Sequence, residues 1–128
     1  MNEKRLVNLF MELVQVDSEK LVQIFSEMGV DVKEDDSAQT TGHGAGNLII
    51  EIPATDGLEH LPGLLFTCHM DTVVPGRGIK PRLDDDGYIR SDGTTILGSD
   101  DKAGIAAMIE ALHILREKNV PHGPIQYV

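Results

Sequence analysis

A short apolar run that ends abruptly in polar residues constrains this sequence more than any other feature. Residues 64–68 are Leu-Leu-Phe-Thr-Cys, a pattern typical of a buried strand, and His69, Met70 and Asp71 follow at once. Open α/β sheets place their binding and catalytic side chains just beyond the carboxyl ends of their strands. We therefore expect His69 and Asp71 to emerge at such a position.

A second polar segment lies about thirty residues further along. Residues 98–104 form a glycine-containing loop that leads into an apolar periodic helix expected over residues 102–118. Asp100 and Asp101 stand where the loop becomes the helix, and one carboxylate would be enough to cap it. Two adjacent aspartates suggest that one points into a site, although simple capping by both remains the alternative.

The rest of the pattern alternates helices with apolar strands. This alternation favours an α/β fold with three layers and a largely parallel or mixed sheet. Asp17 is expected to cap the second helix, and Asp84, Asp85 and Asp86 are expected to lie in a solvated turn and not at a calcium site. We expect helices over residues 3–16 and 19–28, strands over residues 30–33, 47–52 and 64–68, an exposed loop over residues 34–46 that includes His43, a hairpin over residues 84–90, and a strand beginning at residue 125.

Charge and composition exclude several classes of partner. The chain has 21 acidic and 11 basic side chains and a formal net charge of −10, which would repel nucleic acid and anionic membrane surfaces. No apolar stretch approaches the roughly eighteen residues that a spanning helix needs. The single cysteine, Cys68, cannot form an internal disulfide, and the first residues do not form a good signal peptide. We expect a cytoplasmic protein that binds neither nucleic acid nor membrane.

The two polar segments together suggest a metal site. Residues two apart in an extended segment face the same way, so Asp71 can accept the second N–H of the His69 imidazole and orient the ring. An imidazole nitrogen and the Asp100 carboxylate are donors that zinc accepts. The alternative is a strand with a polar end beside an ordinary capped helix.

These segments also resemble a known family. Residues 68–76, Cys-His-Met-Asp-Thr-Val-Val-Pro-Gly, and residues 91–104, Ser-Asp-Gly-Thr-Thr-Ile-Leu-Gly-Ser-Asp-Asp-Lys-Ala-Gly, resemble two signatures of the co-catalytic zinc exopeptidases. That family includes peptidase T, carboxypeptidase G and the aminoacylases, and the residues of these two segments are most similar to those of peptidase T. The resemblance implies that residues 1–128 are the N-terminal part of a three-layer α/β/α zinc-peptidase catalytic domain, without the lid and dimerisation domain.

The resemblance also implies a role for each site residue. His69 would bind one zinc ion, Asp71 would act as the catalytic aspartate that orients it, and Asp100 would bridge two zinc ions. A cis peptide bond is expected between Asp100 and Asp101. The implied activity is that of a tripeptidase or aminopeptidase, in which a water activated by two zinc ions hydrolyses short peptides.

These expectations are limited by site residues that members of the family contain after the strand at residue 125. Members continue into a Glu-Glu pair that supplies the general base and a zinc ligand, so we expect a domain incomplete at its C-terminus and a chain with little peptidase activity alone. An N-acyl amino acid deacylase of the same family, or a non-catalytic binding or assembly module, are the alternatives. The strand at residues 125–128 is expected to leave an open sheet edge through which copies of the chain could associate.

Overall fold

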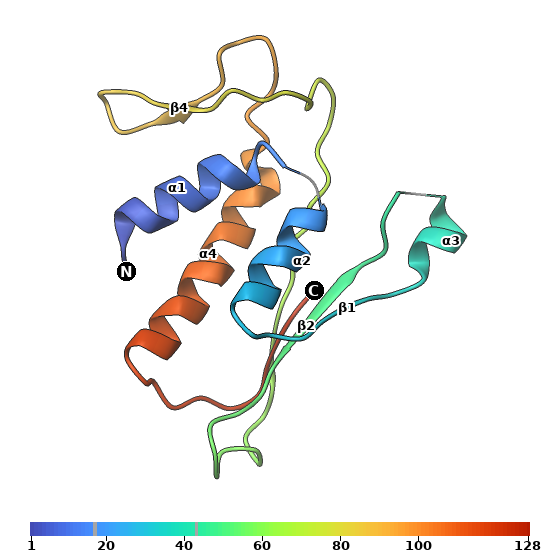
Figure 1. The fold of residues 1–128 in the computed structure, drawn as a ribbon, viewed down its shortest axis with the longest axis vertical. Coiled ribbons are helices and arrows are strands. Elements are labelled where there is room, and N and C mark those ends of the chain that lie inside the picture. Colours follow the sequence, from blue (N-terminus) through green and yellow to red (C-terminus); the bar gives the residue numbers. More distant parts are fainter. Residues whose placement is uncertain (17, 43) are drawn as a thin grey trace. The chain divides into compact units, whose positions relative to one another are not determined.

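The computed structural model describes residues 1–16, 18–42 and 44–128, so the predicted cap at Asp17 and the loop residue His43 lie outside the described residues. The chain forms two compact units, Met1–Asp17 with His69–Leu112 and Ser18–Cys68 with His113–Val128. Figure 1 labels the four helices and the strands β1, β2 and β4. The elements in chain order are α1 (Glu3–Leu13), α2 (Ser18–Glu27), β1 (Val32–Glu34), α3 (Ser37–Thr41), β2 (Leu48–Ile52), β3 (Leu64–Phe66), β4 (Arg82–Leu83), β5 (Ile89–Arg90), α4 (Ser99–Glu117) and β6 (Ile125–Tyr127).

In the first unit, α1 packs through one apolar face. Its N-cap is Asn2, whose side chain accepts a hydrogen bond from the Arg5 backbone N–H at 3.1 Å. Phe10 and Leu13 are buried, as the spacing of apolar residues predicts for an amphipathic helix. The helix ends at Leu13, before the expected end at residue 16.

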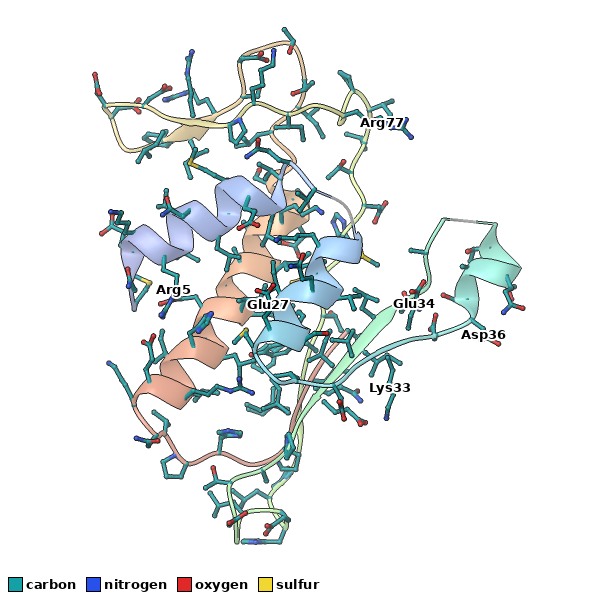
Figure 2. All side chains as sticks on the ribbon, in the orientation of Figure 1. Arg5, Glu27, Lys33, Glu34, Asp36 and Arg77 are labelled. Atoms are coloured by element: carbon teal, nitrogen blue, oxygen red, sulfur yellow. The ribbon has the colours of Figure 1, made fainter. Side chains whose placement is uncertain are left out.

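A buried ion pair joins α1 to α4 within this unit. The Glu110 carboxylate is 3% exposed and accepts hydrogen bonds from Arg5 Nε at 2.6 Å and Arg5 Nη2 at 3.0 Å. The Asn2 backbone N–H donates to the same carboxylate at 2.7 Å. Figure 2 shows Arg5 extending from α1. Because a buried carboxylate is costly without partners, these three bonds fix how the two helices pack.

The second unit is built around a mixed sheet in the order β1-β2-β6-β3. β2 pairs antiparallel with β1 and with β6, whereas β3 pairs parallel with β6. Tyr127 of β6 is 2% exposed, and its ring lies 6.4 Å from the ring of Phe25 on α2. The expected mixed sheet of an α/β fold is therefore present. No helix in the described part of the chain is long and apolar enough to cross a membrane.

Two expectations about the strands are wrong. β3 is not buried, because Leu64, Leu65 and Phe66 are 57%, 61% and 46% exposed. β6 is not an open edge, because it lies between β2 and β3. Both errors have one cause: an apolar pattern identifies a strand but does not tell which neighbours it acquires in the sheet.

The expected loop over residues 34–46 contains the five-residue helix α3. The helix ends at Gly42, whose φ of 74° is the left-handed cap that glycine adopts without steric cost. Its N–H donates to the Ala38 carbonyl at 2.9 Å. The expected exposure holds for α3, which has no buried residue, whereas Gly46 at the end of the segment is buried.

The Asp35 carboxylate connects the two ends of this segment through hydrogen bonds. Asp35 Oδ1 accepts hydrogen bonds from the Ser37 hydroxyl at 2.6 Å and from the Asn47 backbone N–H at 2.9 Å, while Oδ2 accepts from Asn47 Nδ2 at 2.8 Å. The Ser37 side chain and then the Asn47 side chain hold the pKa of Asp35 well below its usual value, because their bonds favour the ionised form.

Candidate functional site

The two polar segments predicted from the sequence come together in the first unit. The Ile96 N–H donates to the Pro75 carbonyl at 3.0 Å, which joins the chain after His69 to the chain before Asp100. Gly98 has a φ of 73°, and a Cβ there would lie 3.3 Å from Thr72 Cγ2. Glycine therefore permits both the backbone conformation and the close approach of the two segments.

His69 contacts both predicted aspartates. Its Nε2 lies 3.0 Å from Asp100 Oδ1, and its Nδ1 lies 3.0 Å from the Asp71 carbonyl oxygen and 3.4 Å from Asp71 Oδ1. Asp71 therefore orients the ring mainly through its backbone, not through the carboxylate that the sequence suggested. All three side chains are open to solvent, with exposed fractions of 52% for His69, 92% for Asp71 and 93% for Asp100.

This arrangement gives His69 an unusual electrostatic setting. The Asp71 carbonyl can only accept, so Nδ1 carries the proton that it shares with this oxygen. In a neutral imidazole, Nε2 then presents a lone pair to the Asp100 carboxylate, which also only accepts. The hydrogen bond to the Asp71 carbonyl, followed by that to the Asp100 side chain, raises the pKa of His69. The position between Nε2 and Asp100 thus favours a proton or another cation.

The donors match part of a zinc site. Zinc binds imidazole nitrogen and carboxylate oxygen and takes four ligands in most proteins. His69 and Asp100 provide one donor of each kind with their donor atoms already facing each other. Over residues 1–16, 18–42 and 44–128, however, no group of three or more His, Cys, Asp or Glu side chains could hold a metal ion. The described residues therefore fit a metal as two direct ligands and not as a complete coordination shell.

The two adjacent aspartates at the start of α4 do different things. Asp101 Oδ1 accepts from the Gly104 N–H at 3.1 Å and so caps the helix, while Asp100 turns to His69. Both residues have non-helical backbone angles, and the peptide bond between them is cis, as the family resemblance implied. Regular helix therefore begins at Lys102, the start expected from the sequence.

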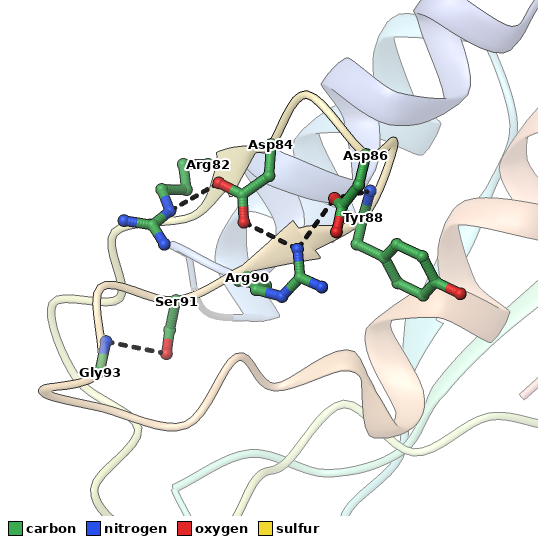
Figure 3. A network of polar contacts seen from close by, with 7 residues as sticks. All are labelled: Arg82, Asp84, Asp86, Tyr88, Arg90, Ser91 and Gly93. Carbon is green, nitrogen blue, oxygen red and sulfur yellow. Dashed lines mark hydrogen bonds and ion pairs between the residues drawn. The ribbon is translucent and has the colours of Figure 1, made fainter.

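The acidic run at residues 84–86 lies in the predicted hairpin, formed by antiparallel β4 and β5. Figure 3 shows that Asp84 and Asp86 pair with arginine: Arg90 Nη1 lies 2.8 Å from Asp84 Oδ2 and 2.9 Å from Asp86 Oδ1. Arg82 Nε lies 2.7 Å from Asp84 Oδ1. The Arg90 guanidinium lowers the pKa of Asp86. These ion pairs were not predicted from the sequence, although the hairpin register places Arg82 opposite Arg90 and so brings both arginines near the acidic turn.

The fold of this chain is similar to that of two solved peptidase structures. The aminopeptidase PepT from Bacillus cereus ATCC 10987 matches 99% of this chain with a TM-score of 0.90 and 57% identity. A tripeptidase from Staphylococcus aureus subsp. aureus Mu50 matches 99% of it with a TM-score of 0.90 and 49% identity. The predicted α/β fold is confirmed by these matches.

Sequence comparison agrees with the structural one. The uncharacterized protein YqjE of Bacillus subtilis strain 168 is 53% identical over 136 residues, which include 99% of this chain. No family model matches the chain. The chain spans 36% of the length of this relative and 36% of each of the two solved structures. The predicted resemblance to peptidase T-like exopeptidases is confirmed over that portion.

Proposed function

We propose that this chain supplies the histidine and aspartate part of the active site of a zinc-dependent exopeptidase that hydrolyses short peptides. The observation that carries the proposal is the 3.0 Å approach of His69 Nε2 to Asp100 Oδ1, with Nδ1 held by the Asp71 carbonyl. A preoriented imidazole facing a carboxylate is suited to a divalent cation. The relation to an aminopeptidase and a tripeptidase supports peptides as the substrates.

Each of the three residues has its own task in this proposal. His69 and Asp100 would hold zinc, with Asp100 shared between two ions, and Asp71 would orient the imidazole. Bound zinc would polarise the scissile carbonyl and make a nucleophile of water near neutral pH. In this proposal the residues of this chain bind the metal and orient its ligand, and removal of a proton from the attacking water requires a general base from elsewhere. We therefore expect the chain alone to bind zinc weakly and to turn over peptides slowly or not at all.

Zinc titration tests the assignment of ligands. We expect His69→Ala and Asp100→Asn to weaken zinc binding about tenfold or more in isothermal titration calorimetry. Asp71→Asn should weaken it less, because the backbone carbonyl that holds His69 Nδ1 is unchanged. The matched control is His60→Ala, because His60 is also an exposed histidine but lies in the other unit. Equal losses for the His60 and His69 variants would show nonspecific surface binding and overturn the assignment.

A substrate assay tests the reaction class. The chain is incubated with zinc and a tripeptide, alone and then with a separately expressed polypeptide equivalent to the unmatched part of the Bacillus cereus aminopeptidase. We expect cleavage with that polypeptide present, lost in the His69→Ala variant. Turnover of an N-acyl amino acid in place of the tripeptide would instead identify a deacylase.

A further inference from the structure

Thr72 lies between the two segments that carry the candidate zinc ligands. It directly follows Asp71 in the first segment, and its Cγ2 would lie 3.3 Å from a Cβ added to Gly98 in the second. Gly98 is buried and is two residues before Asp100. The partly buried Thr72 side chain therefore reaches from the segment of His69 to the segment of the other ligand.

Thr72 is connected to His69 through one peptide group. The carbonyl oxygen that lies 3.0 Å from His69 Nδ1 is that of Asp71, so it belongs to the peptide group that joins Asp71 to Thr72. Because a peptide group is planar, this oxygen moves as one rigid unit with the Cα of Thr72. A displacement of Thr72 would therefore move the oxygen that holds the imidazole.

The surroundings of Thr72 leave its side chain little room. A Cβ at Gly76 would lie 2.7 Å from Thr72 Oγ1 and 2.9 Å from the Val73 carbonyl oxygen, which is closer than side chains normally approach. Gly76 is not among the glycines with positive φ, so this close approach, and not the backbone conformation, requires glycine. Threonine is also β-branched, which restricts its χ1 angle. With Gly76 beside Oγ1 and Gly98 beside Cγ2, Thr72 acts as a stiff spacer.

We propose that Thr72 is a positioning residue that sets how His69 faces Asp100. The peptide group that it shares with Asp71 holds the imidazole, and its Cγ2 methyl limits how closely the segment of Asp100 can approach. This role rests on the proposed function, because the pair that Thr72 positions is the proposed zinc-binding pair. Groups that orient a ligand without touching the metal still affect the metal affinity. Thr72 itself contacts no metal and no reacting atom in this proposal.

A pair of compensating substitutions tests this role by zinc titration. Gly98→Ala adds a Cβ against the Thr72 methyl and should weaken zinc binding. Thr72→Ser removes that methyl and should weaken binding about threefold, which is less than the roughly tenfold loss typical of removing a group that holds a ligand. The double variant should bind zinc about threefold more tightly than Gly98→Ala alone, because the added Cβ occupies the space that the methyl leaves.

Two matched controls separate this contact from a general loosening of the unit. Thr95→Ser makes the same chemical change at a partly buried threonine of the same unit, and no Thr95 atom lies within 4 Å of a Cβ at Gly98. It should bind zinc like the wild type and should not improve Gly98→Ala. Gly78→Ala adds a methyl where φ is 67° and no atom lies within 4 Å, so Thr72→Ser should not improve it either.

The tautomer of His69 provides a readout that requires no metal. At a pH where the ring is neutral, the wild type should carry its proton on Nδ1, which the chemical shifts of the two ring nitrogens report. Thr72→Ser and Gly98→Ala should each move these shifts toward a mixture of tautomers, and the double variant should move them back. A merely structural role for Thr72 would lower the urea midpoint and leave the ring shifts unchanged.

Two results would overturn the role of Thr72. One is a double variant in which the two losses of zinc affinity multiply, since Thr72 and Gly98 would then act independently. The other is a Thr72→Ser protein whose ring-nitrogen shifts equal those of the wild type. A wild type that binds no zinc would contradict the proposed function instead, and the ring shifts of the variants would still decide whether Thr72 positions His69.

Discussion

The ion pair between Arg5 and Glu110 offers the sharpest test of how the first unit is held together. The side chains are 25% and 3% exposed, so the two charges differ in how much water they can recover when the partner is removed. Methionine is a suitable replacement at both positions because its helix propensity is close to those of Arg and Glu. The pair can therefore be dismantled one charge at a time without disturbing α1 or α4 locally.

The expected losses are unequal. Of the three hydrogen bonds to Glu110 described above, Arg5→Met leaves the one from the Asn2 N–H, and the carboxylate stays buried. Breaking a buried ion pair in this way lowers the free energy of unfolding by about 3 to 5 kcal/mol. Glu110→Met leaves a guanidinium that is already one-quarter exposed, so we expect a smaller loss of about 2 kcal/mol. The double variant should lie within about 1 kcal/mol of the wild type, because no uncompensated charge remains.

Urea unfolding followed by far-UV circular dichroism measures all three. With a slope of about 1 to 2 kcal/mol per molar urea, Arg5→Met should lower the midpoint by about 2 to 3 M or more. The control is Lys33→Met, which breaks a pair whose side chains are 68% and 57% exposed and should cost less than about 1 kcal/mol. The reasoning is refuted should the double variant lose the sum of the single losses, since the charges would then act independently.

Three further predictions concern Asp35, Gly98 and Leu112. The pKa of Asp35 is lowered in the folded protein, so ionised Asp35 stabilises the fold. This stabilisation is present above the ordinary pKa of 3.8 and is lost as the pH falls through the lowered value. Urea midpoints of Asp35→Ala should therefore fall less than those of the wild type between pH 7 and about pH 2, and an equal fall would contradict this. Gly98→Ala should lower the free energy of unfolding by about 1 to 2 kcal/mol and reduce zinc affinity. The control is Gly78→Ala, where φ is 67° but no atom lies within 4 Å of the added Cβ, so only the backbone cost should appear and the zinc titration should be unchanged. Leu112→Ala, at a side chain 0% exposed, should cost about 2 to 5 kcal/mol, and thermal melts should show no comparable loss for Leu83→Ala, whose side chain is 52% exposed.

Local signals in the sequence predicted the site segments well. Asp100 and Asp101 mark the start of α4 because a carboxylate there caps free N–H groups, and this preference acts within a few residues. The spacing of His69 and Asp71 similarly predicts that the two residues interact, although not that a backbone oxygen makes the shorter contact. Such preferences depend on neighbours along the chain, which a sequence displays directly.

Contacts between distant segments were not predictable in the same way. Arg5 and Glu110 are 105 positions apart in the sequence. The one local indication that Glu110 is buried is its position one helical turn after Ala106, which faces the core. The strand order β1-β2-β6-β3 likewise inserts the last strand between two earlier ones. Apolar periodicity determines that a segment is extended, whereas strand order depends on which edges meet during folding.

The exposure of His69 and Asp100 to water limits how strongly the site can attract a cation. His69 and Asp100 already face each other at 3.0 Å, but their side chains are 52% and 93% open to water, which screens the attraction between them and any cation. Excluding water from such a site would strengthen these same contacts without moving an atom. Under the proposed function, zinc affinity is therefore the quantity that should respond when the separately expressed polypeptide is added, and we expect it to rise while the His69 to Asp100 arrangement stays the same.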